Sequence, residues 1–209
     1  LASFLSGQPP AQVQEEEHRP VSKDRIFEFP RLDVAVDDFE AQGFILDIGG
    51  GGEGVIGQLK GTQVIAIDLR KKELEDAPPG PALKIVMDAR DLKFLNNTFN
   101  RATVFFTFMY IQSTDHEKVF RDLYRVIGPG GHLLIWDVIF PARTDLKKDV
   151  ALFPLRIKLP GKTIETGYGV PWPPQAQGLP HYTELAERTG FKIIVSSEKN
   201  GWIFLELQK

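Results

Sequence analysis

The sequence predicts an α/β fold with a mostly parallel β-sheet, helices on both faces and an antiparallel hairpin at the C-terminus. Short apolar runs alternate with helix-like stretches from residue 43 onward, which is typical of a parallel sheet with crossover helices. Each run is almost continuously apolar, as expected for strands that helices cover on both faces. Near the end, Asn200 and Gly201 separate two further apolar runs, and this pair favours a tight hairpin turn.

These runs predict a seven-stranded sheet. With 209 residues, 42% of them hydrophobic, the chain can form one domain with a substantial core, which we place at residues 25–209. The expected parallel strands are 44–48, 63–67, 83–87, 102–106 and 132–136, and the expected hairpin strands are 191–197 and 202–207.

Two helices are well marked in the sequence. Residues 115–127 place apolar side chains on one face, and Thr114 with Glu117 fits a capping box at the start of this helix. Gly128 and the proline after it then end the helix. A second helix is expected at 182–189, where a glycine again marks the end and the hairpin follows.

Three segments fall outside this pattern. Residues 1–24 have few apolar positions, and we expect a mobile arm there. Residues 25–39 alternate apolar and polar positions around Pro30, which fits an edge strand or an extended wrap over the core. Residues 140–180 form a long insertion rich in aromatic residues, proline and glycine, and we expect a lid or substrate loop. The alternative is a surface-packed insertion.

Composition excludes several classes of function. With 28 acidic and 25 basic residues, the net charge of −3 disfavours a nucleic-acid partner. The chain has no cysteine, so disulfides, thiolate metal sites and a cysteine nucleophile are excluded. Its 4 histidines have no ligand spacing, and no metal site is expected. No run of 18 apolar residues occurs, so we expect no membrane partner and a soluble, cytoplasmic protein.

A glycine cluster follows the first parallel strand, in the segment FILDIGGGGEGVIGQL. Gly49, Gly51 and Gly54 fit the spacing G-x-G-x-x-G, in which glycine lets the backbone turn tightly against a ligand. Asp68 ends the next strand, where a carboxylate can bind ribose hydroxyls. Taken alone, these features fit a dinucleotide site, although Asp68 also suits the N-cap of a helix.

Two further acidic residues favour a different cofactor. Asp47 lies at the strand end, where its charge would repel a pyrophosphate but attract a cationic amino-acid group, directly or through a water. Asp88 and Ala89 close the third strand, where a carboxylate and a backbone N–H can bind an adenine ring. Because the carboxyl ends of parallel strands line the ligand crevice, Asp47, Asp68 and Asp88 should lie around one ligand.

These motifs resemble those of class I S-adenosylmethionine-dependent methyltransferases, which have a Rossmann-like fold. The resemblance covers residues 43–137 by motif and the C-terminal hairpin by topology. It implies S-adenosylmethionine as cofactor and S-adenosylhomocysteine as product. It also implies that the glycine turn contacts the methionine part, Asp68 the ribose, and Asp88 with Ala89 the adenine. The expected cofactor-binding residues are Asp47, Gly49, Gly50, Gly51, Asp68, Leu69, Asp88, Ala89 and Phe106.

The acceptor side of the site is less well marked. Glu53 stands where the family usually has its third glycine, and Tyr110 lies where a histidine pair is common. Tyr110 and Trp172 are the expected substrate residues, although Tyr110 also fits a cap on the sheet surface. Phe106 and its neighbour Phe105 also fit a purely structural role in the core. No general base is assigned; the candidates are Tyr110, Asp137, His181 and Glu165, with a surface position the alternative for His181.

The resulting functional prediction is methyl transfer to a small-molecule acceptor. The segment FFTFMYI lacks the Asn-Pro-Pro-Tyr sequence used to methylate planar amino groups, and the absence of cysteine excludes covalent methylation at pyrimidine C5. One alternative is a non-catalytic protein that binds S-adenosylmethionine on the same fold. The other is an NAD(P)-dependent oxidoreductase, which the glycine spacing supports. The oligomeric state is not predicted.

Overall fold

A computed structural model describes residues 21–209, and its main element is a seven-stranded sheet with the order β10-β11-β7-β6-β3-β4-β5. The five strands β7, β6, β3, β4 and β5 run parallel to one another, whereas β11 runs antiparallel to β7 and β10 runs antiparallel to β11. The strands are β3 (Ile45–Ile48), β4 (Val64–Asp68), β5 (Leu83–Val86), β6 (Phe99–Phe105), β7 (Ile127–Val138), β10 (Lys192–Lys199) and β11 (Trp202–Gln208). The predicted fold class is confirmed.

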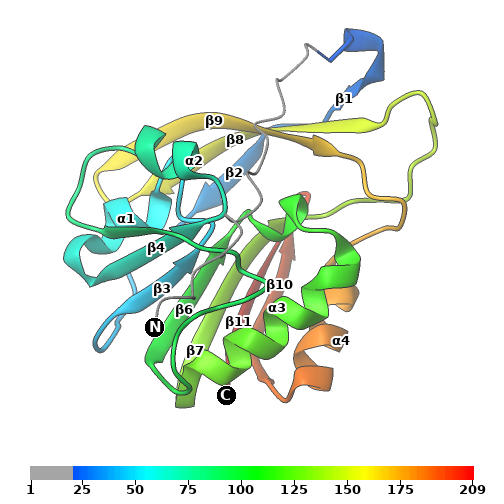
Figure 1. The fold of residues 1–209 in the computed structure, drawn as a ribbon. Helices are drawn as coiled ribbons and strands as arrows, with labels where there is room; N and C mark the ends of the chain where they lie inside the picture. The colour runs from blue at the N-terminus through cyan, green and yellow to red at the C-terminus, as the bar shows by residue number, and fades with distance from the viewer. Residues whose placement is uncertain (1–20) are drawn as a thin grey trace, which may run out of the picture.

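Helices cover both faces of this sheet. Helices α1 (Val55–Lys60) and α2 (Lys71–Asp76) pack their apolar side chains into one core, together with Leu134 and Trp136 of β7. On the other face, α3 (Ser113–Val126) and α4 (Leu179–Thr189) contact each other and pack on the intervening β7 residues (Figure 1). Because neighbouring residues of a strand point to opposite faces, β7 contributes to both cores.

The insertion 140–180 contains a β-hairpin, so the expectation of a long loop is wrong. Strands β8 (Val150–Leu159) and β9 (Lys162–Pro171) pair antiparallel, and β1 (Ile26–Glu28) and β2 (Leu32–Ala35) pair parallel with the other side of β8. The segment 25–39 therefore forms edge strands on either side of Pro30. This second, four-stranded sheet packs on the core that holds α1 and α2, and Figure 1 shows β8 and β9 across the top of the molecule.

Local details correct one further expectation and confirm another. Helix α3 begins at Ser113 with Gln112 as N-cap and no capping side chain, so the Thr114–Glu117 capping box does not form. Glu117 instead pairs with Arg121 and Arg188, which links α3 to α4. The Asn200–Gly201 hairpin turn is confirmed, because both residues have positive φ angles of 39° and 95°.

The expected arm at 1–24 lies largely outside the described residues; at its end, Lys23–Arg25 form a short 3₁₀ helix, η1. Two further 3₁₀ turns are η2 (Gly61–Gln63) and η3 (Phe108–Tyr110). Within residues 21–209, no helix has the length and apolarity needed to cross a membrane. The same residues contain no group of three or more potential metal ligands.

Candidate active site

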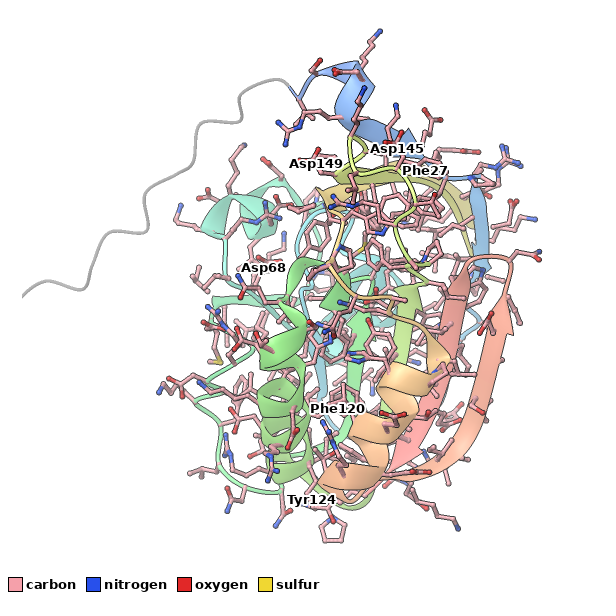
Figure 2. All side chains as sticks on the ribbon, turned by 90° about the vertical axis from the view of Figure 1, so that its right-hand side faces the viewer. Phe27, Asp68, Phe120, Tyr124, Asp145 and Asp149 are labelled. Atoms are coloured by element: carbon pink, nitrogen blue, oxygen red, sulfur yellow. The ribbon has the colours of Figure 1, made fainter. Side chains whose placement is uncertain are left out.

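A cavity of about 720 Å³ opens at the carboxyl ends of β3, β4 and β6. This volume is typical of small-molecule sites. Figure 2 shows Asp68 at the end of β4, below Asp149 near the second sheet and above Phe120 in α3. Residues of both sheets line the cavity, among them Gly49, Gly51, Asp68, Leu69, Asp88, Ala89, Phe106, Tyr110 and Tyr168.

The glycine turn is held tightly between its neighbours. The backbone N–H groups of Gly49 and Gly50 both donate to the carbonyl oxygen of Ile67, at 2.8 and 3.0 Å. Gly49 has a φ angle of +70°, and a Cβ atom there would collide with the side chain of Thr107. A Cβ on Gly51 would lie 2.5 Å from Glu73 Cβ and 2.9 Å from Asp68 Oδ2. Only glycine fits these positions without a shift of the surrounding atoms.

Asp47 lies beneath the glycine turn rather than in the wall of the main cavity. Its side chain is buried, and Thr103 Oγ1 donates a hydrogen bond of 2.7 Å to Asp47 Oδ1. Burial raises the pKa of Asp47 to about 7. A small cleft of about 20 Å³ connects Asp47 with Gly50 and Gly51, which is enough volume for one water molecule. The expected contact of Asp47 with a cationic group therefore fits the water-mediated form only.

Asp68 occupies the predicted position at the end of β4. Its Oδ1 accepts the backbone N–H of Arg70 at 2.9 Å, while Oδ2 lies on the side of Gly51. Helix α2 takes Arg70 as its N-cap, so the alternative assignment of Asp68 as the cap is wrong. Leu69 follows with 48% of its surface exposed and also lines the cavity. Asp68 therefore lines the cavity, with one carboxylate oxygen bonded to the Arg70 N–H and the other on the side of Gly51.

Asp88 and Ala89 line the cavity as predicted, but the Asp88 carboxylate already forms an ion pair with the Arg90 guanidinium. Arg90 Nε and Nη2 donate to the two Asp88 oxygens at 2.9 and 2.7 Å, and Arg90 Nη1 reaches Asp115 Oδ2 at 3.2 Å. The Arg90 guanidinium holds the pKa of Asp88 below its usual value. Arg90 is a cavity residue that the sequence analysis missed, since an arginine after the acid has no signature of its own.

The segment after β6 forms the next wall. Phe106 is buried and has a φ angle of +49°, which is strained for a bulky side chain. Thr107 follows this turn and lies against Gly49, and η3 comes next and brings Tyr110 to the cavity wall. Phe105 and Phe106 are both core and cavity residues, so the two alternatives for them coexist. Tyr110 lies half exposed in the wall, 6.0 Å from the Arg70 guanidinium, and burial raises the pKa of its phenol.

The second sheet supplies one wall, from the insertion 140–180 that was expected to be a lid or substrate loop. Tyr168 of β9 donates its hydroxyl hydrogen to Glu53 Oε2 at 2.8 Å, and Thr166 donates to Glu53 Oε1. These bonds join the hairpin to the glycine turn. Trp172, by contrast, is not among the residues that line the cavity. It packs on Phe27 and Phe29, so the structure does not bring this predicted substrate residue into the site.

Three of the four candidate bases also lie outside the cavity wall. Asp137 is fully buried, burial raises its pKa to about 7, and the backbone N–H groups at the start of η3 face its carboxylate. His181 is half-buried and hydrogen-bonds to the buried His116 at 2.9 Å, so the alternative of a surface histidine is wrong. Glu165 is exposed and pairs with Arg156. Only Tyr110 lines the cavity.

The charges of the cavity suit a cationic ligand. Four carboxylates line it, from Glu53, Asp68, Glu73 and Asp88, against the guanidiniums of Arg70 and Arg90. Both guanidiniums are already paired, with Glu73 and Asp88 respectively. Among the described residues, Glu53 and Asp68 form no salt bridge. The excess of negative charge, together with the close fit at Gly51, is compatible with a sulfonium cofactor.

Comparisons with known proteins agree with this geometry. Residues 46–135 match the model of the methyltransferase domain family. No curated protein matches the chain by sequence.

Among solved structures, an S-adenosylmethionine-dependent methyltransferase from Mesorhizobium loti is similar in fold, with a TM-score of 0.59 at 15% identity over 82% of this chain and 94% of its own. Phosphoethanolamine N-methyltransferase 2 from Haemonchus contortus, in complex with S-adenosylmethionine, has a TM-score of 0.59 at 16% identity, over 82% of this chain and 50% of its own. A possible histamine N-methyltransferase from Thermotoga maritima has a TM-score of 0.56 at 14% identity, over 80% and 83% of the two chains. Residues 46–135 thus match a methyltransferase domain, and the chain shares the fold of solved S-adenosylmethionine-dependent methyltransferases.

Proposed function

We propose that this methyltransferase transfers the methyl group to a small-molecule acceptor, which binds between η3 and β9. One observation carries the proposal: the same cavity joins the glycine turn and Asp68 to a wall formed by Phe106, Tyr110 and Tyr168. The first group of residues can hold a cofactor, and the second can hold an acceptor beside it. The family match favours an S-adenosylmethionine site over the oxidoreductase alternative, and the transfer assay separates methyl transfer from non-catalytic binding.

Within this proposal, the cofactor residues act by position and charge. Asp68 accepts hydrogen bonds from the ribose hydroxyls, and Asp88 with Ala89 lies at the adenine. Leu69 and Phe106 provide apolar surface, while Gly49 and Gly51 allow close approach of the backbone and Asp47 supports Gly50 from below.

S-adenosylmethionine supplies an electrophilic methyl group on a positively charged sulfur. The protein therefore has to align donor and acceptor and exclude water, and such positioning can lower a barrier by roughly 7–11 kcal/mol. The strained turn at Phe106 and the bonds between Glu53 and Tyr168 fix the two walls that provide this alignment. Because burial raises the pKa of both Tyr110 and Tyr168, their phenols stay protonated at neutral pH and act as hydrogen-bond donors and aromatic surface.

The size of the site supports a small acceptor. A cavity of about 720 Å³ has to hold the cofactor as well as the acceptor. The similar H. contortus and T. maritima proteins are named for phosphoethanolamine and, as a possible substrate, histamine, which are both small molecules.

The test is a transfer assay with methyl-labelled S-adenosylmethionine and a fractionated cell extract. We expect label in the low-molecular-mass fraction and release of S-adenosylhomocysteine that depends on this fraction. The Asp68→Ala variant should fail in the same assay. Label in the protein or nucleic-acid fraction instead would contradict a small-molecule acceptor.

A further inference from the structure

Three aromatic side chains form the acceptor end of the cavity. The ring of Tyr168 lies 5.9 Å from the ring of Phe106, with an interplanar angle of 46°. It lies 6.3 Å from the ring of Tyr110, at 72°. The three residues come from three separate elements, namely β9, η3 and the strained turn after β6. All three side chains line the cavity, and the π-face of an aromatic ring attracts a cation.

A carboxylate lies directly against this aromatic wall. Each of the two Glu53 carboxylate oxygens accepts one hydrogen bond, one from the Tyr168 hydroxyl and the other from the Thr166 hydroxyl. Both donors are neutral, and among the described residues Glu53 has no salt-bridge partner. The nearby Arg70 is paired with Glu73, and Arg90 with Asp88. The wall therefore combines aromatic side chains with a carboxylate that forms no salt bridge within the described chain, while the Arg70 guanidinium, paired with Glu73, lies 6.0 Å from the Tyr110 ring.

We infer that the acceptor is an organic amine, whose nitrogen becomes an ammonium group between the aromatic wall and Glu53. The inference rests on the proposed function, because it assigns the chemical class of the acceptor at the same site. Aromatic faces with an adjacent carboxylate are the groups that recognise alkylated ammonium ions.

The charge balance of the reaction explains why such a wall suits an amine. The nitrogen lone pair forms the new N–C bond, the C–S bond breaks, and its electron pair stays on sulfur. The positive charge thus leaves the sulfur, which becomes a neutral thioether, and appears on the nitrogen. Primary and secondary amines then release one proton to water, whereas a tertiary amine keeps the charge. The cavity holds one cation before and immediately after methyl transfer, so the unpaired carboxylates of Glu53 and Asp68 favour both states.

A binding experiment tests the inference without turnover. The full chain is saturated with S-adenosylhomocysteine, and calorimetry then measures the affinity for choline and for its neutral isostere, 3,3-dimethyl-1-butanol. The two probes have the same shape and differ in charge. We expect choline to bind at least about fivefold more tightly, in line with the strength of cation–π contacts.

Paired variants locate the effect at the wall. Tyr168→Leu removes the ring and should abolish the preference for choline, whereas Tyr168→Phe keeps the ring and should retain most of it. Tyr110→Leu and Tyr110→Phe form a second pair with the same expected contrast. Binding of S-adenosylhomocysteine to each variant reports that the variant is folded.

The outcomes separate the two proposals. If S-adenosylhomocysteine binds but the two probes bind equally, or neither binds, the amine assignment is overturned and the methyltransferase site stands. A preference for choline that persists unchanged in Tyr168→Leu and Tyr110→Leu also overturns it. If S-adenosylhomocysteine does not bind to the wild-type chain, the proposed function fails and the inference fails with it.

Discussion

The two sheets of the molecule differ in how their strands meet solvent. All four residues of β3 in the seven-stranded sheet are buried, whereas buried residues alternate with mostly half-buried ones along β8 in the four-stranded sheet. The first pattern arises because packed layers cover both faces of β3, and the second because one face of β8 meets water. A strand buried on both faces is therefore marked by its apolar run, while a half-exposed strand is easily mistaken for a loop.

The two sheets also divide the chemistry of the site. The strand ends of the seven-stranded sheet supply the glycine turn and Asp68, which we assign to the cofactor. The four-stranded sheet supplies Tyr168, which we assign to the acceptor. The bonds from Tyr168 and Thr166 to Glu53 connect the two halves. Substitutions on one sheet should therefore affect cofactor affinity, and those on the other should mainly affect the acceptor.

The largest effect is expected at Asp68, on the cofactor side. Asp68→Ala removes an acceptor that we assign to both ribose hydroxyls, and each such charged hydrogen bond contributes about 1.5–3 kcal/mol. Calorimetry should show S-adenosylhomocysteine binding more than ~100-fold more weakly. Asp68→Asn keeps one oxygen acceptor and should lie between the two. If both variants bind S-adenosylhomocysteine as tightly as the wild type does, Asp68 is not part of the cofactor site.

The next largest effect concerns pH and a buried acid at the end of β7. Burial raises the pKa of Asp137 from 3.8 to about 7, so the native state holds this proton more tightly than the unfolded chain does. The stabilisation is complete below about pH 4 and is lost as the pH rises through about 7, with a total of roughly 4 kcal/mol at most.

Urea unfolding at several pH values tests this effect. Asp137→Asn, which stays neutral, should make the decline in the free energy of unfolding between pH 4 and pH 8 clearly shallower, while the part caused by the raised pKa of Asp47 remains. Asp37→Asn, at an exposed position just after β2, serves as the matched control and should keep the wild-type slope. Identical slopes for the wild type and Asp137→Asn would contradict a buried, protonated Asp137.

Two glycines, one from each sheet, should separate close packing from backbone strain. In Gly51→Ala, the new Cβ collides with Glu73, and such overpacking costs about 1–3 kcal/mol. Gly161 in the β8–β9 turn has a φ angle of +80° and open space around it, so Gly161→Ala costs only about 1–2 kcal/mol of strain. Both variants should unfold more easily, but only Gly51→Ala should lose affinity for S-adenosylhomocysteine. Equal loss in both would refute the close approach at Gly51.

The smallest effect is expected for the bond between the two halves. Tyr168→Phe removes the hydroxyl that binds Glu53, which should cost about 1 kcal/mol. For a chain of this size, that lowers Tm by about 2–4 °C in a thermal melt. Glu165→Gln, on the same strand, breaks only an exposed pair with Arg156 and should change Tm by less. The reverse order would mean that Glu53 and Tyr168 do not join the sheets.

The sequence predicted the seven-stranded sheet because its strands carry local signals. Strand β4 is a continuous apolar run that ends in an acid, and Asn200 with Gly201 has few alternatives to a tight turn. The four-stranded sheet is marked only in part, by the alternation at residues 25–39 that favoured an edge strand, whereas β8 and β9 were expected to be a loop. Strand β8 pairs with β1 and β2, more than a hundred residues away, and that pairing depends on tertiary contacts.

The same distinction holds for the candidate site. Gly51 and Asp68 belong to one short motif, and the structure brings them together in the cavity wall. Glu53 was noted only as a departure from the family pattern, because its partner Tyr168 lies more than a hundred residues away. Trp172 has the residue type of a substrate contact, yet the pairing of β1 with β8 places it against Phe27 instead. Its location is set by the second sheet, which the sequence did not reveal.

A thermal melt with two competing cofactors tests the central claim most directly. The wild-type chain is unfolded alone, with S-adenosylhomocysteine and with NAD, each in hundredfold excess over the dissociation constant measured for S-adenosylhomocysteine. We predict that S-adenosylhomocysteine stabilises the fold by about 2.7 kcal/mol, that NAD does not, and that Asp68→Ala loses the stabilisation. Stabilisation by NAD alone, or a shift with S-adenosylhomocysteine that survives in Asp68→Ala, would contradict the assignment of this cavity.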